Sequence, residues 1–163
     1  MSLRHVPKSR SPSRGRPKPA QEVAVALLAR RDFSAAALAR RLLARGFPSQ
    51  AIGEVIAVLT AQGVLNEARY AQNYVAWHVA RGQGPLRIAA ELRKEGLANA
   101  LIEEALGEGV DWEALACKVR IGKFGARPPA SWPEKARQAR FLQYRGFSSD
   151  HIRAATGADP DLD

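Results

Sequence analysis

The sequence predicts an all-α protein made of three tandem three-helix repeats, each like a helix-turn-helix, that form an elongated, curved body. From residue 21 onward Ala, Leu, Arg and Glu dominate, and these residues favour helices. No segment shows the alternating β-branched pattern that is typical of strands. Identical residues also recur at intervals of 50 positions, which indicates an internal repeat. The recurring sets are Ala39, Ala89 and Ala139; Leu42, Leu92 and Leu142; Gly46, Gly96 and Gly146; and Ile52, Ile102 and Ile152.

Gly and Pro punctuate the chain at short intervals and divide it into nine expected helices. Their expected ranges are 21–31, 34–45, 49–62, 66–80, 84–95, 99–107, 111–123, 134–145 and 149–156. The expected N-caps, whose side-chain oxygens can accept hydrogen bonds from the first turn, are Ser34, Ser49, Asn66, Asn99, Asp111 and Ser149. Gly46, Gly96 and Gly146 are expected to end the middle helix of each repeat, because glycine adopts the left-handed conformation at little cost.

The recurrence groups these helices into repeats at residues 21–65, 66–110 and 111–157. Within each repeat the recurring Ala and Leu lie on one face of the middle helix, and the recurring Ile packs onto it from the third helix. A unit of about 45 residues can bury only a marginal core by itself. We therefore expect the repeats to stack and to share interfaces.

Charge is distributed unevenly along the chain. Its 163 residues include 25 Lys and Arg and 16 Asp and Glu, a formal net charge of +9. Residues 1–20 are rich in Pro, Ser and basic side chains, so we expect a disordered basic arm. Such an arm is either an electrostatic tether for nucleic acid or a solvated leader without a partner. Residues 158–163 form an acidic tail.

The sequence lacks the usual features of enzymes, metal sites and membrane proteins. The single cysteine, Cys117, cannot form an intramolecular disulfide, which fits a reducing, cytoplasmic location. The three histidines lie far apart, so no metal is expected. No phosphate-binding loop, dinucleotide fingerprint or nucleophile motif occurs, so neither a cofactor nor catalysis is expected. No apolar stretch reaches the roughly 18 residues that a membrane span needs.

Basic residues gather on and around the middle helix of each repeat. Stacking of the repeats would align these helices, and their side chains would form a basic stripe suited to phosphates or acidic protein surfaces. The expected members of the stripe are Arg40, Arg41, Lys94, Lys123 and Arg137. For any one of them the alternative is an ordinary solvated helix face.

Aromatic residues are expected mainly in the core. Tyr70, Tyr74 and Trp77 recur at i, i+4 and i+7, which is the spacing of a helix packing face. The aromatic segment 141–147 is likewise expected to be mostly core.

Several motifs together resemble the bacterial RecX family of recombination regulators. They are Arg30-Arg31-Asp32-Phe33-Ser34, Arg45-Gly46-Phe47, Arg69-Tyr70-Ala71, Arg81-Gly82-x-Gly84-Pro85-x-Arg87-Ile88 and Arg140-Phe141-Leu142-x-x-Arg145-Gly146-Phe147. The resemblance covers residues 21–157 and implies three three-helix repeats. It also implies a partner, the RecA recombinase filament on single-stranded DNA, whose ATPase, strand-exchange and co-protease activities the family dampens without being an enzyme.

The resemblance supplies no catalytic residue. We expect the partner-binding residues among the basic and junction residues of these motifs, which are Arg69, Tyr70, Arg81, Arg87, Arg140 and Arg145. These, with the stripe, are expected to contact the RecA filament and single-stranded or duplex DNA.

Two other functions remain open at this point. One is direct DNA binding by a helix-turn-helix array, which steep salt dependence would favour. Against sequence-specific reading, Glu103 and Glu104 on a third helix would repel phosphates. The other is a passive helical scaffold for a different protein. A monomer is expected in each case, because the repeats bury one another's faces.

Overall fold

The structure, a computed structural model, describes residues 19–158. Most of the expected basic arm and acidic tail lies outside the described residues. The described part contains nine helices and no strand. The helices are α1 (Ala20–Leu28), α2 (Ala35–Leu43), α3 (Ser49–Ala61), α4 (Glu67–Val79), α5 (Pro85–Lys94), α6 (Asn99–Gly107), α7 (Trp112–Phe124), α8 (Trp132–Arg145) and α9 (Ser149–Thr156). The all-α fold class is therefore confirmed.

Helix boundaries follow local capping chemistry, with corrections to the expected caps. Ser34, Asn66 and Asp111 cap α2, α4 and α7 as expected, each accepting a hydrogen bond from the first turn. The expectation was wrong for the caps of α3, α6 and α9, which are Pro48, Ala98 and Ser148. In each case the polar residue expected as the cap is instead the first residue of the helix, and the residue before it is the cap.

The last long helix also begins earlier than expected. Ser131 caps α8 in a capping box with Glu134, so the helix starts at Trp132 rather than at residue 134. Backbone N–H groups of Ala130 and Ser131 donate to the Glu134 carboxylate and hold its pKa below the usual range.

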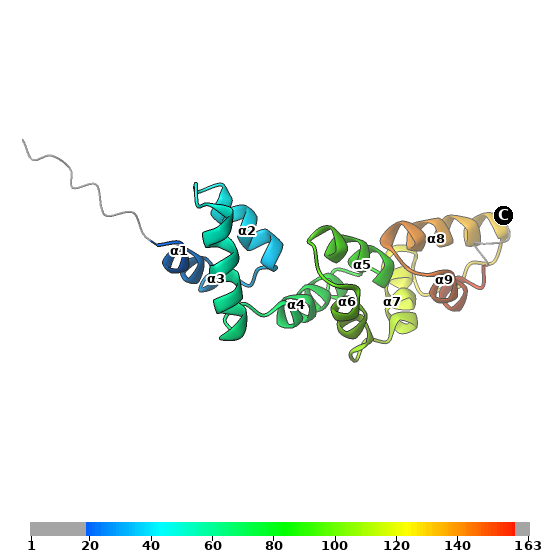
Figure 1. Ribbon diagram of the computed structural model, residues 1–163. Helices are drawn as coiled ribbons and strands as arrows, with labels where there is room; N and C mark the ends of the chain where they lie inside the picture. The colour runs from blue at the N-terminus through cyan, green and yellow to red at the C-terminus, as the bar shows by residue number, and fades with distance from the viewer. Residues whose placement is uncertain (1–18, 159–163) are drawn as a thin grey trace, which may run out of the picture.

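The molecule is elongated, and the three repeats lie one after another along its long axis (Figure 1). Helices that pack closely against each other always belong to the same repeat. The first repeat contains α1 to α3, the second α4 to α6 and the third α7 to α9. Each repeat has its own core, and three separate clusters of buried residues follow one another along the chain. Stacking therefore does not merge the repeats into one continuous core.

The recurring residues form equivalent parts of each repeat. Leu42, Leu92 and Leu142 are fully buried, one in each cluster. The recurring Ile side chains are also buried. Gly46, Gly96 and Gly146 have φ values of 85°, 85° and 93°, so each ends its middle helix in the left-handed conformation. The 50-residue recurrence therefore reflects a repeated helix-turn-helix geometry.

Candidate functional site

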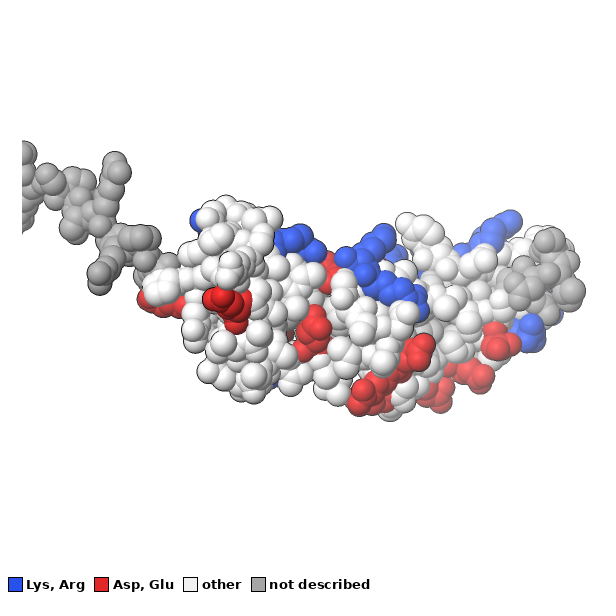
Figure 2. Space-filling view, viewed as in Figure 1, with Lys and Arg blue, Asp and Glu red and all other residues white. Residues whose placement is uncertain are grey.

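The middle helices α2, α5 and α8 lie along one edge of the molecule (Figure 1). Lys and Arg gather on this edge, whereas Asp and Glu gather along the opposite edge (Figure 2). Basic residues occupy the last turn of each middle helix, where they complement the helix dipole. We call the surface formed by these three helices the basic edge, and the Lys and Arg residues of the helices are Arg40, Arg41, Arg87, Arg93, Lys94, Lys135, Arg137, Arg140 and Arg145.

The structure separates the expected site residues into two groups. The members of the basic edge come from all three repeats. Four other expected residues lie off the middle helices, because Arg69 and Tyr70 are on α4, Arg81 follows α4, and Lys123 is on α7. Tyr70 is half-buried beside the second core, and this burial raises the pKa of its phenol.

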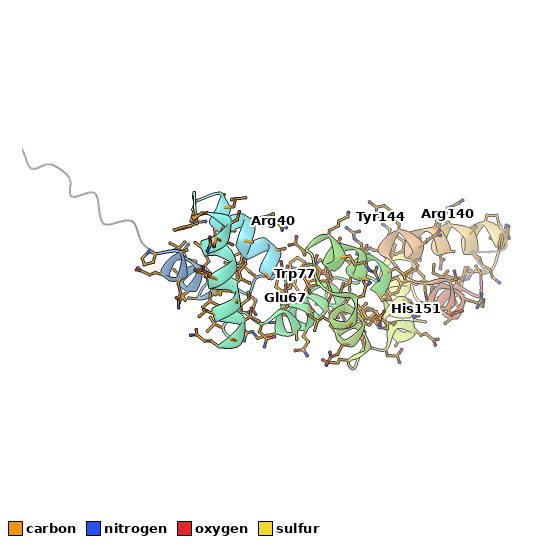
Figure 3. The ribbon with its side chains drawn as sticks, viewed as in Figure 1. Arg40, Glu67, Trp77, Arg140, Tyr144 and His151 are labelled. Atoms are coloured by element: carbon orange, nitrogen blue, oxygen red, sulfur yellow. The ribbon has the colours of Figure 1, made fainter. Side chains whose placement is uncertain are left out.

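The three middle helices also carry exposed apolar side chains. Leu43 on α2 and Leu86 on α5 are each 58% exposed, and Tyr144 on α8 is 80% exposed. Figure 3 shows Tyr144 and Arg140 together on the outer side of α8. Exposed apolar groups next to arginines are the composition of protein-binding surfaces.

The expectation that the aromatic segment 141–147 is mostly core was wrong for Tyr144. The buried face of α8 is set by Gln138, Ala139 and Leu142. Tyr144 follows Leu142 by two positions, about 200° around the helix, and therefore points away from the core. Trp77 was also expected on a packing face but is 52% exposed. Both residues lie among aromatic residues whose pattern predicts a core position. The sequence therefore did not single out Tyr144 or Trp77 as an exposed residue that could bind a partner.

Several cations of the expected site have no carboxylate partner among residues 19–158. Lys94, Lys123 and Arg140 form no ion pair or hydrogen bond with another described residue. The Arg41 guanidinium lies 5.7 Å from the centroid of the Phe33 ring, and that of Arg137 lies 5.4 Å from the Phe124 ring. These side chains are free to contact a partner.

Arg69 instead joins the first two repeats. Its Nη2 donates to Asp32 Oδ1 at 2.8 Å and to the Val64 carbonyl at 3.2 Å. The hydrogen bonds from Arg69, its charge, and a further hydrogen bond from Asn73 hold the pKa of Asp32 below its usual value. Arg69 is therefore a structural residue of this junction.

The other polar links of this first junction are also made by side chains. The Ala35 N–H donates to Glu67 Oε1 at 2.8 Å, so a residue of α4 helps to cap α2. Arg40 pairs with Glu95 at 3.1 Å, although 59% of the Arg40 side chain remains exposed. The first two repeats are thus joined largely by charged and polar side chains.

The second and third repeats are joined through the backbone. The Gly84 N–H donates to the Arg145 carbonyl at 2.8 Å, and the Leu86 N–H donates to the Gly146 carbonyl at 3.0 Å. Arg145 Nη1 also donates to the Arg81 carbonyl at 3.0 Å. The two sequence motifs at residues 81–88 and 140–147 therefore meet here and hold the second and third repeats together.

Arg81 and Arg87 have partners within the second repeat. The Arg81 guanidinium lies 3.1 Å from the centroid of the Trp77 ring. Arg87 Nε donates to Glu91 Oε1 at 3.1 Å, and Tyr74 Oη donates to Glu91 Oε2 at 2.7 Å. Burial opposes ionisation of Glu91, but these hydrogen bonds outweigh it and lower the pKa of the carboxyl. Burial and the Glu91 carboxylate together raise the pKa of Tyr74 far above its usual value.

Among the described residues, no three His, Cys, Asp or Glu side chains are grouped closely enough to hold a metal ion. No helix at residues 19–158 is both long and apolar enough to cross a bilayer. Cys117 is half-buried on α7.

Family models match each of the three helical units. They describe the first, second and third three-helix domains of RecX and match residues 20–59, 66–106 and 111–156. The curated Regulatory protein RecX of Halorhodospira halophila is 45% identical over 139 residues, which cover 85% of this chain and 86% of that protein. Regulatory protein RecX of Pseudomonas fluorescens is 41% identical over 133 residues, covering 81% of this chain and 86% of that protein.

Solved structures of the same kind share the fold. The crystal structure of RecX from Lactobacillus salivarius matches with a TM-score of 0.74 and 20% identity, covering 83% of this chain and 91% of that chain. A second crystal structure of regulatory protein RecX matches with a TM-score of 0.70 and 20% identity, covering 83% of this chain and 71% of that chain. The three-repeat arrangement is therefore common to this chain and to both structures.

Proposed function

This chain belongs to the RecX family, and on that premise we propose that it is a non-catalytic regulator of the RecA recombinase. It would bind the RecA filament on single-stranded DNA and inhibit its ATPase, strand-exchange and co-protease activities during DNA repair and the SOS response. The relatives that it matches are named regulatory proteins, which supports a regulatory role.

The observation that carries this proposal is the basic edge. It runs across all three repeats on the same side of an elongated molecule (Figure 2). A surface of this length can contact more than one protomer of a polymer at once. Lys94 and Arg140 make no ion pair with another described residue, so they can pair with acidic side chains or phosphates of the filament.

A physical mechanism for inhibition follows from such bridging. A ligand that binds one relative orientation of neighbouring protomers better than another shifts the filament towards the preferred orientation. ATP hydrolysis by a filament depends on how its protomers meet. Binding along the basic edge would therefore reduce ATPase activity although this chain supplies no catalytic group.

The contacts of each side chain determine which residues can test the proposal. Arg69 and Arg145 link neighbouring repeats, and Arg87 pairs with Glu91 within α5. Charge reversal at Arg87 would place a carboxylate beside Glu91, so a loss of inhibition in that variant could reflect a damaged fold. Arg140 and Tyr144 are exposed and are the better choice.

The test is a titration of RecA ATPase activity on single-stranded DNA with the wild-type chain and variants. Arg140→Glu and Tyr144→Ala should each raise the half-inhibitory concentration by about tenfold, as expected for central residues of a binding surface. Lys118→Glu is the matched control, because it makes the same charge change at an exposed residue of α7. Circular dichroism should show equal helicity in all variants.

Each outcome has a distinct meaning. If Arg140→Glu and Lys118→Glu inhibit as well as the wild type, the basic edge is not the contact surface. If the wild-type chain leaves the ATPase unchanged, regulation of RecA is wrong. Retained, salt-sensitive DNA binding in that second case would favour direct DNA binding as the function.

A further inference from the structure

Two adjoining hollows lie at the junction of the first and second repeats. One has a volume of about 400 Å³ and is lined by residues of α2, the segment before it, and Glu95. The other, of about 500 Å³, is lined by the same preceding segment and by α4. Arg31 lines both hollows, so they adjoin at this residue, and we call the pair the junction groove.

One half of the junction groove is rich in unpaired positive charge. Arg31, Arg40 and Arg41 line it, against a single acidic residue, Glu95, which Arg40 already engages. The guanidinium of Arg31 lies 4.5 Å from the centroid of the Phe33 ring, and neither Arg31 nor Arg41 forms an ion pair with another described residue. Two guanidinium groups therefore face the groove without a carboxylate, which favours binding of an anion.

The other half of the junction groove is an aromatic wall on α4. Tyr70, Tyr74, Trp77 and His78 line it. Asn73 and Asp32 also line this half, and the Asp32 carboxylate is engaged by Arg69 and Asn73. The Tyr74 and His78 rings are stacked with centroids 4.1 Å apart, and the Trp77 ring meets His78 edge-on at 4.7 Å. Trp77 is 52% exposed, and Figure 3 places it at the boundary between the first two repeats.

The wall is rigid, because neighbouring groups fix its rings. The Tyr74 hydroxyl is hydrogen-bonded to Glu91, and the His78 ring is hydrogen-bonded to Gln83. Arg81 packs against Trp77 and donates to its carbonyl at 3.1 Å. An exposed indole held in place in this way can stack with a flat ligand at little cost in conformational entropy.

We propose that the junction groove binds single-stranded nucleic acid, with phosphates at Arg31 and Arg41 and an unpaired base stacked at Trp77. A cationic track beside aromatic rings is the combination that recognises single strands without sequence preference. In a duplex the bases are paired and stacked on one another, so they cannot reach the aromatic wall. An acidic peptide would use the arginines but leave the indole without a partner.

The proposal goes beyond regulation of RecA, because the groove binds the strand directly. The test therefore contains no RecA: anisotropy of a fluorescein-labelled oligothymidylate is titrated with the full chain. Trp77→Ala should weaken binding by about 5- to 150-fold, the usual range for loss of one stacked base, and Trp77→Phe should restore most of it. Trp132→Ala is the matched control, because Trp132 is also 52% exposed but lies in the third repeat.

Two further measurements separate the roles of charge and stacking. Arg31→Glu and Arg41→Glu should each lower the slope of log affinity against log salt by roughly 0.7 for the contact removed. Trp77→Ala should leave that slope, and the affinity for duplex DNA, unchanged. If Trp77→Ala and Trp132→Ala bind the oligonucleotide equally well, the proposal is wrong. If polyglutamate displaces the oligonucleotide and Trp77→Ala has no effect, the groove binds acidic protein segments instead.

Discussion

At the scale of single residues, Gly84 decides how the second and third repeats meet. A side chain at this position would overlap the backbone of Gly146, although the φ of Gly84 is an ordinary −84°. The requirement for glycine is therefore one of space and not of backbone conformation. This close approach permits the two backbone hydrogen bonds of the junction.

Gly84→Ala should consequently destabilise the protein by about 1–3 kcal/mol, the usual cost of forcing an extra carbon into a packed site. Gly53→Ala is the matched control, because Gly53 lies inside α3 and a Cβ there would meet nothing within 4 Å. That variant should gain up to about 1 kcal/mol, since alanine favours helices over glycine. Urea unfolding followed by circular dichroism measures both changes. Equal stability of the two variants would contradict the role given to Gly84.

At the scale of one element, α8 departs from its counterparts at a single buried position. Leu38 in α2 and Ile88 in α5 are fully buried, whereas the equivalent residue of α8 is Gln138, which is 4% exposed. Its Oε1 atom has no hydrogen-bond partner among the described residues. A buried polar atom without a partner costs about 1–3 kcal/mol.

We therefore expect Gln138→Leu to stabilise the protein by at least about 1 kcal/mol, because it removes the unsatisfied oxygen and restores the side chain found in the first repeat. Thermal unfolding followed by circular dichroism tests this expectation. Leu38→Gln is the reciprocal variant and should destabilise the first repeat. A loss of stability in Gln138→Leu would show that the amide has a partner in solution.

At the scale of the whole molecule, the two junctions between repeats differ in kind. Backbone hydrogen bonds and a close glycine contact join the second repeat to the third. Ion pairs and hydrogen bonds of side chains, centred on Asp32 and Arg69, join the first repeat to the second. Within residues 19–158, only the first junction depends on a carboxylate whose pKa is lowered by its partners.

Acid should therefore weaken the first junction. Because the pKa of Asp32 is lower in the folded protein than its ordinary value of 3.8, its stabilising effect is complete well above pH 3.8 and is lost as pH falls below it. Asp32→Asn should lower the melting temperature at pH 7, and the difference from wild type should shrink at pH 3. An equal difference at both pH values would contradict an ionic role for Asp32.

The helical class and the threefold recurrence can be predicted from local patterns of the sequence alone. Both follow from local chemistry: helix-favouring composition, capping residues at Ser34 and Asn66, and glycines that end helices in the left-handed conformation. The sequence also indicated the basic stripe, because the repeat places cations on each middle helix.

Which of those residues are free to bind depends on how the repeats pack in three dimensions. Arg69 and Arg87 look like Arg140 in the sequence. The first two are engaged by carboxylates, whereas Arg140 has no such partner in the part of the chain that the structure describes. Trp77 and Tyr144 look like core residues, yet both are exposed. Ion pairs such as Arg69–Asp32 and hollows such as the junction groove are made by residues from different repeats. Their formation depends on how the repeats pack against one another, which local sequence patterns do not encode.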